Sequence, residues 1–260
     1  MRKTPFEKEW NKQCKTELRF AAQKQKGKRD PYEILEKYVP DKLQGTLETA
    51  FVKGFHLVFS KGDPLIQRTL AEEKHTDSYR VNEFKMGLRS NRKNLRSFSR
   101  KAASTGYTNL LFSGLEGLGL GALGIGLPDI PLFIGALLRN IYQICLDYGF
   151  PYDSPAERIF ILKLIQGAVS HGTDFTAVDG QLNLAIDQNA ACQSISDDLL
   201  EAQIIDTANA LSAELLYAKF VQGIPIAGIL GGISNISCMH QVTQYAKLKY
   251  NRRFLVNMQK

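Results

Sequence analysis

The glycines of residues 119–124 are spaced as in a dinucleotide-binding loop. Gly119, Gly121 and Gly124 match the pattern G-x-G-x-x-G, in which glycines let the backbone approach a pyrophosphate. That chemistry needs a strand before the loop and an uninterrupted helix after it. Here an apolar helical pattern precedes the glycines, and Pro128 interrupts the segment after them. We therefore interpret these glycines as a face for helix packing.

The histidines and cysteines are not spaced as in a catalytic or metal site. The histidines are His56, His75, His171 and His240. None lies in a metal-ligand spacing, and the serine-nucleophile pattern G-x-S-x-G is absent from the sequence. The four cysteines form no C-x-x-C pair, and Cys145 and Cys238 lie in apolar runs, as buried thiols in a reducing compartment do. We expect no cofactor, no metal and no enzymatic activity.

A glycine-rich stretch followed by a proline corner predicts an apolar helical hairpin. Between 109 and 127 the only charged residue is Glu116, and glycines three or four residues apart share one helical face. Such a face lets a second helix approach closely. The next helix is expected over 130–148, capped by Asp129. The packing residues predicted here are Gly117, Gly121, Gly124, Pro128, Asp129 and Pro131.

Glu116 and Arg139 are the charges embedded in the two arms of this hairpin. They lie 12 and 11 residues from Pro128, so an antiparallel pairing would bring them together. An unpaired charge in that setting is costly. One interpretation is an ion pair that fixes the helix register, and the other is a site for a lipid headgroup or a peptide.

A second apolar stretch, residues 220–239, contains no charged residue. Gly228 and Gly232 are four residues apart there and favour close helix packing. Pro225 in this stretch, and Glu116 and Arg139 in the hairpin, argue against permanent membrane spans. Core helices, or segments that insert shallowly, fit these patterns better.

The charges are strongly segregated along the chain. Residues 1–29 carry ten Lys or Arg against three Glu, and the last fourteen residues are basic without any acid. Residues 146–214 hold eleven Asp or Glu and only two basic residues. A third basic segment, 80–101, has an apolar stripe that suits an anionic membrane surface, a nucleic-acid backbone or an acidic partner. Its predicted anion contacts are Arg89, Arg92, Lys93, Arg96, Arg100 and Lys101.

The overall pattern predicts an all-α protein, a multi-helix bundle around the glycine-rich hairpin. No long run has the period-two alternation of a strand. Helices are expected over 5–26, 32–38, 41–60, 65–74, 76–104, 158–169, 174–191 and 196–219, besides the apolar stretches. Ser154 and Glu157 match a capping box at the start of one of them. We divide the chain into a basic N-terminal helical extension (1–30), a single helical domain (31–255) and a basic tail (256–260).

Several of these segments together resemble the EcsC protein family. The matching parts are Ser113–Gly117, Gly124–Pro131, Tyr142, Tyr148–Phe150, Val39–Leu43, Ala50–Phe51, Phe55, Glu157–Arg158, Gly223–Gly228, Gly231–Gly232 and Asn235. The Leu-Pro-Asp-Ile-Pro corner is the most specific of them. The family is bacterial, and its namesake is encoded beside an ABC transporter linked to secretion and regulated proteolysis. The resemblance supplies no catalytic residues.

Charge pattern and resemblance favour a non-catalytic, membrane-associated accessory protein that assists an ABC transporter or a secretion process. We expect a cytoplasmic protein, peripheral on the inner face of the cell membrane, with an anionic lipid surface or a membrane protein as its partner. Residues 80–101 and the basic C-terminal tail would face the anionic lipid. Nucleic acid is not expected, because the basic segment has no recognition motif. The alternatives are a soluble helical scaffold and a hydrolase-like enzyme whose pocket would join Glu116, Asp129, Arg139 and His171.

Overall fold

The computed structural model describes residues 3–25, 39–63, 66, 70, 129–188, 196–221 and 233–259. They form the α-helices α1 (Pro5–Gln25), α3 (Asp41–Leu57), α8 (Asp129–Asp147), α9 (Pro155–Val169), α10 (Gly172–Asp187), α11 (Asp197–Val221) and α12 (Ile233–Asn257), and the π-helical turn η1 (Val58–Gly62). These residues contain no strand. The predicted all-α, multi-helix class is confirmed. The first arm of the hairpin and the first half of its corner, up to Pro128, lie outside the described residues, whereas Asp129, Ile130 and Pro131 form the start of α8.

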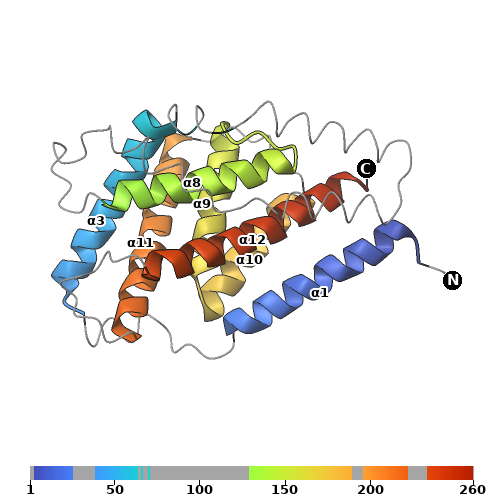
Figure 1. The fold of residues 1–260 in the computed structure, drawn as a ribbon, viewed down its shortest axis with the longest axis horizontal. Coiled ribbons are helices and arrows are strands. Elements are labelled where there is room, and N and C mark those ends of the chain that lie inside the picture. Colours follow the sequence, from blue (N-terminus) through green and yellow to red (C-terminus); the bar gives the residue numbers. More distant parts are fainter. Residues whose placement is uncertain are drawn as a thin grey trace.

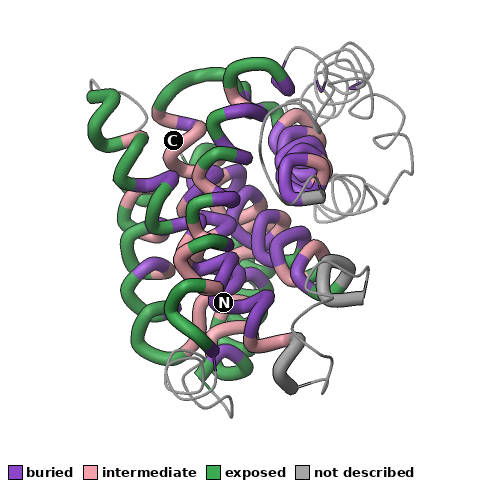
Figure 2. Tube along the Cα trace, turned by 90° about the vertical axis from the view of Figure 1, so that its left-hand side faces the viewer, coloured by how far each residue is buried: buried purple, intermediate pink, exposed green. Residues whose placement is uncertain are grey.

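Helix α9 lies at the centre of the bundle and contacts α10, α11 and α12 (Figure 1). Helix α3 packs against α8 and α11, and α12 contacts α8 as well. The buried residues of these helices lie toward the inside of the bundle and the exposed ones on its outer surface (Figure 2). The resulting core is continuous and rich in aromatic residues.

Helix α1 runs along the outside of the bundle against α10 and α12 (Figure 1). Phe20 stacks on Tyr245 with the ring centroids 5.1 Å apart and also contacts Phe175. Gln13 donates a hydrogen bond to the carbonyl oxygen of Leu248 at 2.8 Å. The inner face of the segment predicted as an N-terminal extension therefore packs against the bundle.

The helix starts follow local capping chemistry. Thr4 and Glu7 form a complete capping box at α1: the Thr4 amide donates to the Glu7 carboxylate and the Glu7 amide donates to the Thr4 hydroxyl. At α9 the Ser154 hydroxyl accepts from the Glu157 amide at 3.2 Å, as predicted. The Glu157 side chain, however, turns into the core, so only half of that predicted box forms.

A glycine turn at its end and a close contact with α3 define the position of α8. Its C-terminal end closes at Gly149, whose φ of 78° is the left-handed conformation that glycine tolerates best. On α3, Gly54 faces Ile130 and Ile134, where an added Cβ would lie 2.7 Å from Ile134 Cδ1. The glycine that lets a helix approach α8 in the described part of the chain therefore comes from α3.

Among the described residues, one helix, over Ile130–Asp147, is long and apolar enough to cross a membrane. In the structure 72% of that stretch is buried, and core helices of soluble proteins meet the same criterion.

Candidate functional site

Most of the predicted site residues lie outside the described residues. They are Glu116, Gly117, Gly121, Gly124, Pro128, Gly228, Gly232 and the basic residues Arg89, Arg92, Lys93, Arg96, Arg100 and Lys101. Of the others, Asp129 begins α8, and Pro131 and Arg139 are buried in it. Burial lowers the pKa of the Arg139 guanidinium. Because Glu116 lies outside the described residues, its pairing with Arg139 stays a prediction.

The carboxylate of Glu157 is buried where α8, α9 and α12 meet. Arg253 Nη1 donates to its two oxygens at 2.8 and 2.7 Å, and the Tyr250 hydroxyl donates to Oε1 at 2.6 Å. The Cys145 thiol lies 3.7 Å from the same oxygen. Burial raises the pKa of the Tyr250 hydroxyl and of the Cys145 thiol well above their usual ranges, so both stay protonated. The cluster ties the three helices together.

Arg158, the next residue, forms a second ion pair on another side of α9. Its Nη2 donates to Asp63 Oδ2 at 2.9 Å, and the Tyr142 hydroxyl donates to Asp63 Oδ1 at 3.0 Å. Tyr142 stacks on Tyr152 with the ring centroids 4.3 Å apart. Burial raises the pKa of Asp63, and the contacts with Tyr142 and Arg158 offset part of that rise. The first turn of α9 is thus tied to both α12 and the end of η1.

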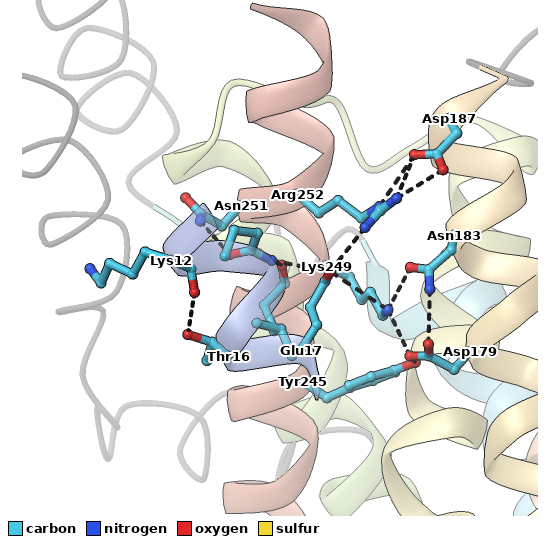
Figure 3. Close-up of polar contacts among 12 residues, drawn as sticks. Lys12, Thr16, Glu17, Asp179, Asn183, Asp187, Tyr245, Lys249, Asn251 and Arg252 are labelled. Atoms are coloured by element: carbon cyan, nitrogen blue, oxygen red, sulfur yellow. Dashed lines mark hydrogen bonds and ion pairs between the residues drawn. The ribbon is translucent and has the colours of Figure 1, made fainter. Parts of the chain in front are cut away.

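Lys249 of α12 is fully buried between α1 and α10 (Figure 3). Its ammonium lies 2.6 Å from Asp179 Oδ1 and 2.7 Å from Asn183 Oδ1. The Tyr245 hydroxyl donates to the same Asp179 oxygen at 2.6 Å. Burial raises the pKa of the Tyr245 hydroxyl, and the Asp179 charge adds to that rise.

Arg252 bridges α1 and α10 at the edge of this cluster (Figure 3). Its Nη1 donates to Glu17 Oε2 at 2.9 Å and its Nη2 donates to the Asp187 carboxylate. The guanidinium also lies over the Trp10 ring. The expectation that the basic C-terminal residues face lipid is therefore wrong for Lys249, Arg252 and Arg253, because internal carboxylates bind all three.

His171, one of the four histidines of the sequence, directly precedes α10. Its Nε2 lies 3.2 Å from Glu214 Oε2, and Gln241 donates to Glu214 Oε1 at 3.1 Å. The buried ammonium of Lys24 donates to Gln241 and to the carbonyl oxygen of Ala168. This cluster joins α1, α9, α11 and α12, and it was not visible in the sequence because its members come from distant segments.

These clusters link helices rather than form a recognisable reaction centre. In the described part of the chain, no group of three His, Cys, Asp or Glu side chains is arranged to hold a metal ion. Burial raises the pKa of the Cys238 thiol to about 12, which makes it a poor nucleophile. The buried carboxylates of Asp63 and Glu157 are held by arginines and tyrosine hydroxyls.

The outer face of α1 carries the clearest candidate surface. Lys8, Lys12, Lys15 and Arg19 are exposed and succeed one another at spacings of four, three and four residues. They form one stripe about 16 Å long on the helix. Leu18, 71% exposed, lies beside it. We call these five residues the α1 basic face; sequence reasoning counted their charges but did not single out the stripe.

Comparison with known proteins supports the resemblance. The model of the EcsC protein family matches residues 7–255. The chain is 27% identical over 146 residues to Protein EcsC of Bacillus subtilis (strain 168), covering 54% of this chain and 56% of that protein. It is 22% identical over 136 residues to the Uncharacterized protein YdbA of the same strain, covering 52% of this chain and 49% of that protein. Each match thus spans about half the length of these relatives. No solved structure matches the chain.

Proposed function

The chain belongs to the EcsC protein family, and on that premise we propose that it is a non-catalytic accessory protein on the anionic inner face of the cell membrane. There it assists a membrane protein, such as an ABC transporter or a secretion system. The observation that carries the proposal is the α1 basic face, a row of exposed cations beside an exposed leucine.

The α1 basic face has the two kinds of side chain by which helices bind anionic lipid, cations and an apolar residue. A Lys or Arg near an anionic membrane surface contributes about 1 kcal/mol. Leu18 lies beside the cations and adds an apolar contact of the kind that interfacial helices use. The inner side of α1 is held by α10 and α12, so the helix presents this face without unfolding.

Two features favour a peripheral over an integral protein. In the described part of the chain, the helix that is long and apolar enough for a membrane span, α8, is largely buried against α3 and α12. It also contains Arg139, whose charge would be costly in a bilayer.

The ion pairs of Glu157 and Arg158 link helices, which supports a structural and not a catalytic use of the buried charges.

The test is co-sedimentation of the full chain with vesicles of phosphatidylcholine containing phosphatidylglycerol. We expect binding at low salt that weakens as salt screens the charges. Changing Lys8, Lys12 and Lys15 to Gln removes about 3 kcal/mol, or on the order of a hundredfold in partitioning.

The matched control changes three exposed lysines of α3 and η1 to Gln: Lys42, Lys53 and Lys61. This variant has the same net charge as the α1 variant but keeps the α1 basic face. The proposal is wrong if the chain does not bind anionic vesicles, or if both variants lose binding equally.

A further inference from the structure

The first half of α11 turns three apolar side chains outward, away from the described bundle. Leu199, Ala202 and Ile205 are exposed, at spacings of three residues. Residues three apart are neighbours on one side of a helix. Leu199 is 57% exposed and Ile205 is 42% exposed, although Ile204, next to Ile205, is buried in the core. We call Leu199, Ala202 and Ile205 the α11 seam.

Acidic side chains flank the α11 seam. Glu201 lies on the edge toward α3, where its carboxylate is 3.2 Å from His56 Nε2. Asp206 lies on the edge toward α9, where its charge acts on Lys163. From 196 to 218 the chain contains no Lys or Arg. The surface that α11 itself contributes around the seam is therefore acidic.

The opposite side of α11 already fixes the helix in the bundle. Ala208 and Leu211 are fully buried, and the Thr207 hydroxyl donates to the carbonyl oxygens of Gln203 and Leu162. The α11 seam is thus not needed to hold α11 in place. An apolar stripe with charged borders is the pattern by which one helix receives another, with the charges selecting the partner.

We propose that the α11 seam docks an amphipathic helix of a partner protein whose own apolar stripe is bordered by Lys and Arg. Charge complementarity selects this chemistry, because Glu201 and Asp206 would face the basic borders and Asp197 and Asp198 extend the acidic surface. The proposal goes beyond lipid binding and does not depend on it. In Figure 1 the first half of α11 lies at the top left and α1 along the lower right, so the two surfaces can be occupied at once.

A second copy of the chain offers a poorer fit. The α1 basic face carries four cations but a single exposed leucine, Leu18, and no continuous apolar stripe. Residues 80–101 of the chain itself combine basic and apolar residues. The experiment must therefore distinguish a partner helix at the α11 seam from this segment.

The test titrates the full chain into a labelled synthetic helix of three heptads with a leucine stripe and Lys/Arg borders. The matched probe has the same stripe with Glu borders. We expect the basic probe to bind at least tenfold more tightly than the acidic one, and high salt to weaken it. The double variant Glu201→Lys, Asp206→Lys should lose at least tenfold in affinity. Asp153→Lys with Asp174→Lys, at exposed positions outside α11, should not.

A second variant, Ile205→Asn, keeps the test valid if the double reversal fails to fold, because this exposed side chain does not support the core. It too should weaken the probe. Equal binding of both probes, or unchanged binding by both α11 variants, overturns the proposal. So does a dimer in light scattering that Glu201→Lys abolishes, since a second copy then fills the seam. The proposal is also wrong if the probe binds much more tightly after Arg89, Arg92 and Lys93 are changed to Gln. In that case the chain's own residues 80–101 occupy the α11 seam.

Discussion

A methyl group added to Gly54 should push α3 away from α8. The new Cβ would lie 2.7 Å from Ile134 Cδ1, closer than carbon atoms pack, and 3.2 Å from Ile130 Cγ2, which is tighter than most carbon contacts. Both isoleucines are fully buried, and a β-branched side chain has one strongly preferred rotamer in a helix. Either the helices separate or a side chain leaves its rotamer. Overpacking of this kind costs about 1–3 kcal/mol.

Gly45, on the same helix, provides the matched substitution. An added Cβ there meets no atom within 4 Å. Gly45→Ala should therefore show only the gain in helix propensity, about 1 kcal/mol. Gly54→Ala makes the same gain and loses it to the clash, so the two variants should differ in unfolding free energy by about 1–3 kcal/mol.

Urea unfolding followed by far-ultraviolet circular dichroism measures this difference. The slope with urea should stay the same in both variants, because the folded and unfolded surfaces are nearly unchanged. If Gly54→Ala is as stable as Gly45→Ala within about 0.5 kcal/mol, the close approach of α3 to α8 at Ile134 is refuted.

Three further predictions concern buried side chains. Glu157→Gln leaves Arg253 buried without its counter-ion and should cost about 3–5 kcal/mol in urea unfolding, whereas the exposed Glu201→Gln should cost under about 1 kcal/mol; equal costs would contradict the ion pair. In a Cys192→Ser background, a thiol reagent should modify Cys14 in the folded chain but Cys145 and Cys238 only after unfolding, because Cys14 is partly exposed whereas the other two are buried. Rapid reaction of Cys145 or Cys238 in the folded chain would show that they are accessible. Because burial raises the pKa of Asp63 above its ordinary 3.8, that group's contribution to stability is complete at low pH and is lost as pH rises through the folded pKa. Asp63→Asn should therefore gain thermal stability relative to the unchanged chain as pH rises from about 4, and the opposite trend would mean a lowered pKa.

Local signals in the sequence predicted several of the described helices. The Ser154-Pro155 start of α9 and the turn at Gly149 follow from capping and glycine conformations that involve only neighbouring residues. The start of α12 was harder to place. A change of composition after residue 239 indicated an apolar segment and a separate basic tail, whereas one helix runs from Ile233 to Asn257. Composition changed there, but the helical hydrogen bonding did not.

Partner choice across the bundle could not be predicted. Lys249 and Asp179 lie 70 positions apart, and Arg253 and Glu157 lie 96 apart, so only the packing of α12 on α9 and α10 brings them together. The segregated charges could have indicated these pairs, because an acidic middle segment and a basic end can neutralise each other inside a bundle. We interpreted the charged segments as exposed binding surfaces, whereas the structure places Arg253 and Lys249 against carboxylates inside the bundle.

Cell fractionation is the most direct measurement of the central claim, that the protein works at a membrane surface. A tagged full chain is expressed in bacteria, and its distribution is followed among the cytosol, the salt-washed membrane and the carbonate-resistant membrane. We predict recovery with the membranes and release by high salt, and a shift to the cytosol when Lys8, Lys12 and Lys15 are changed to Gln. Unchanged protein found only in the cytosol, or membrane protein that resists both salt and carbonate, would contradict the claim.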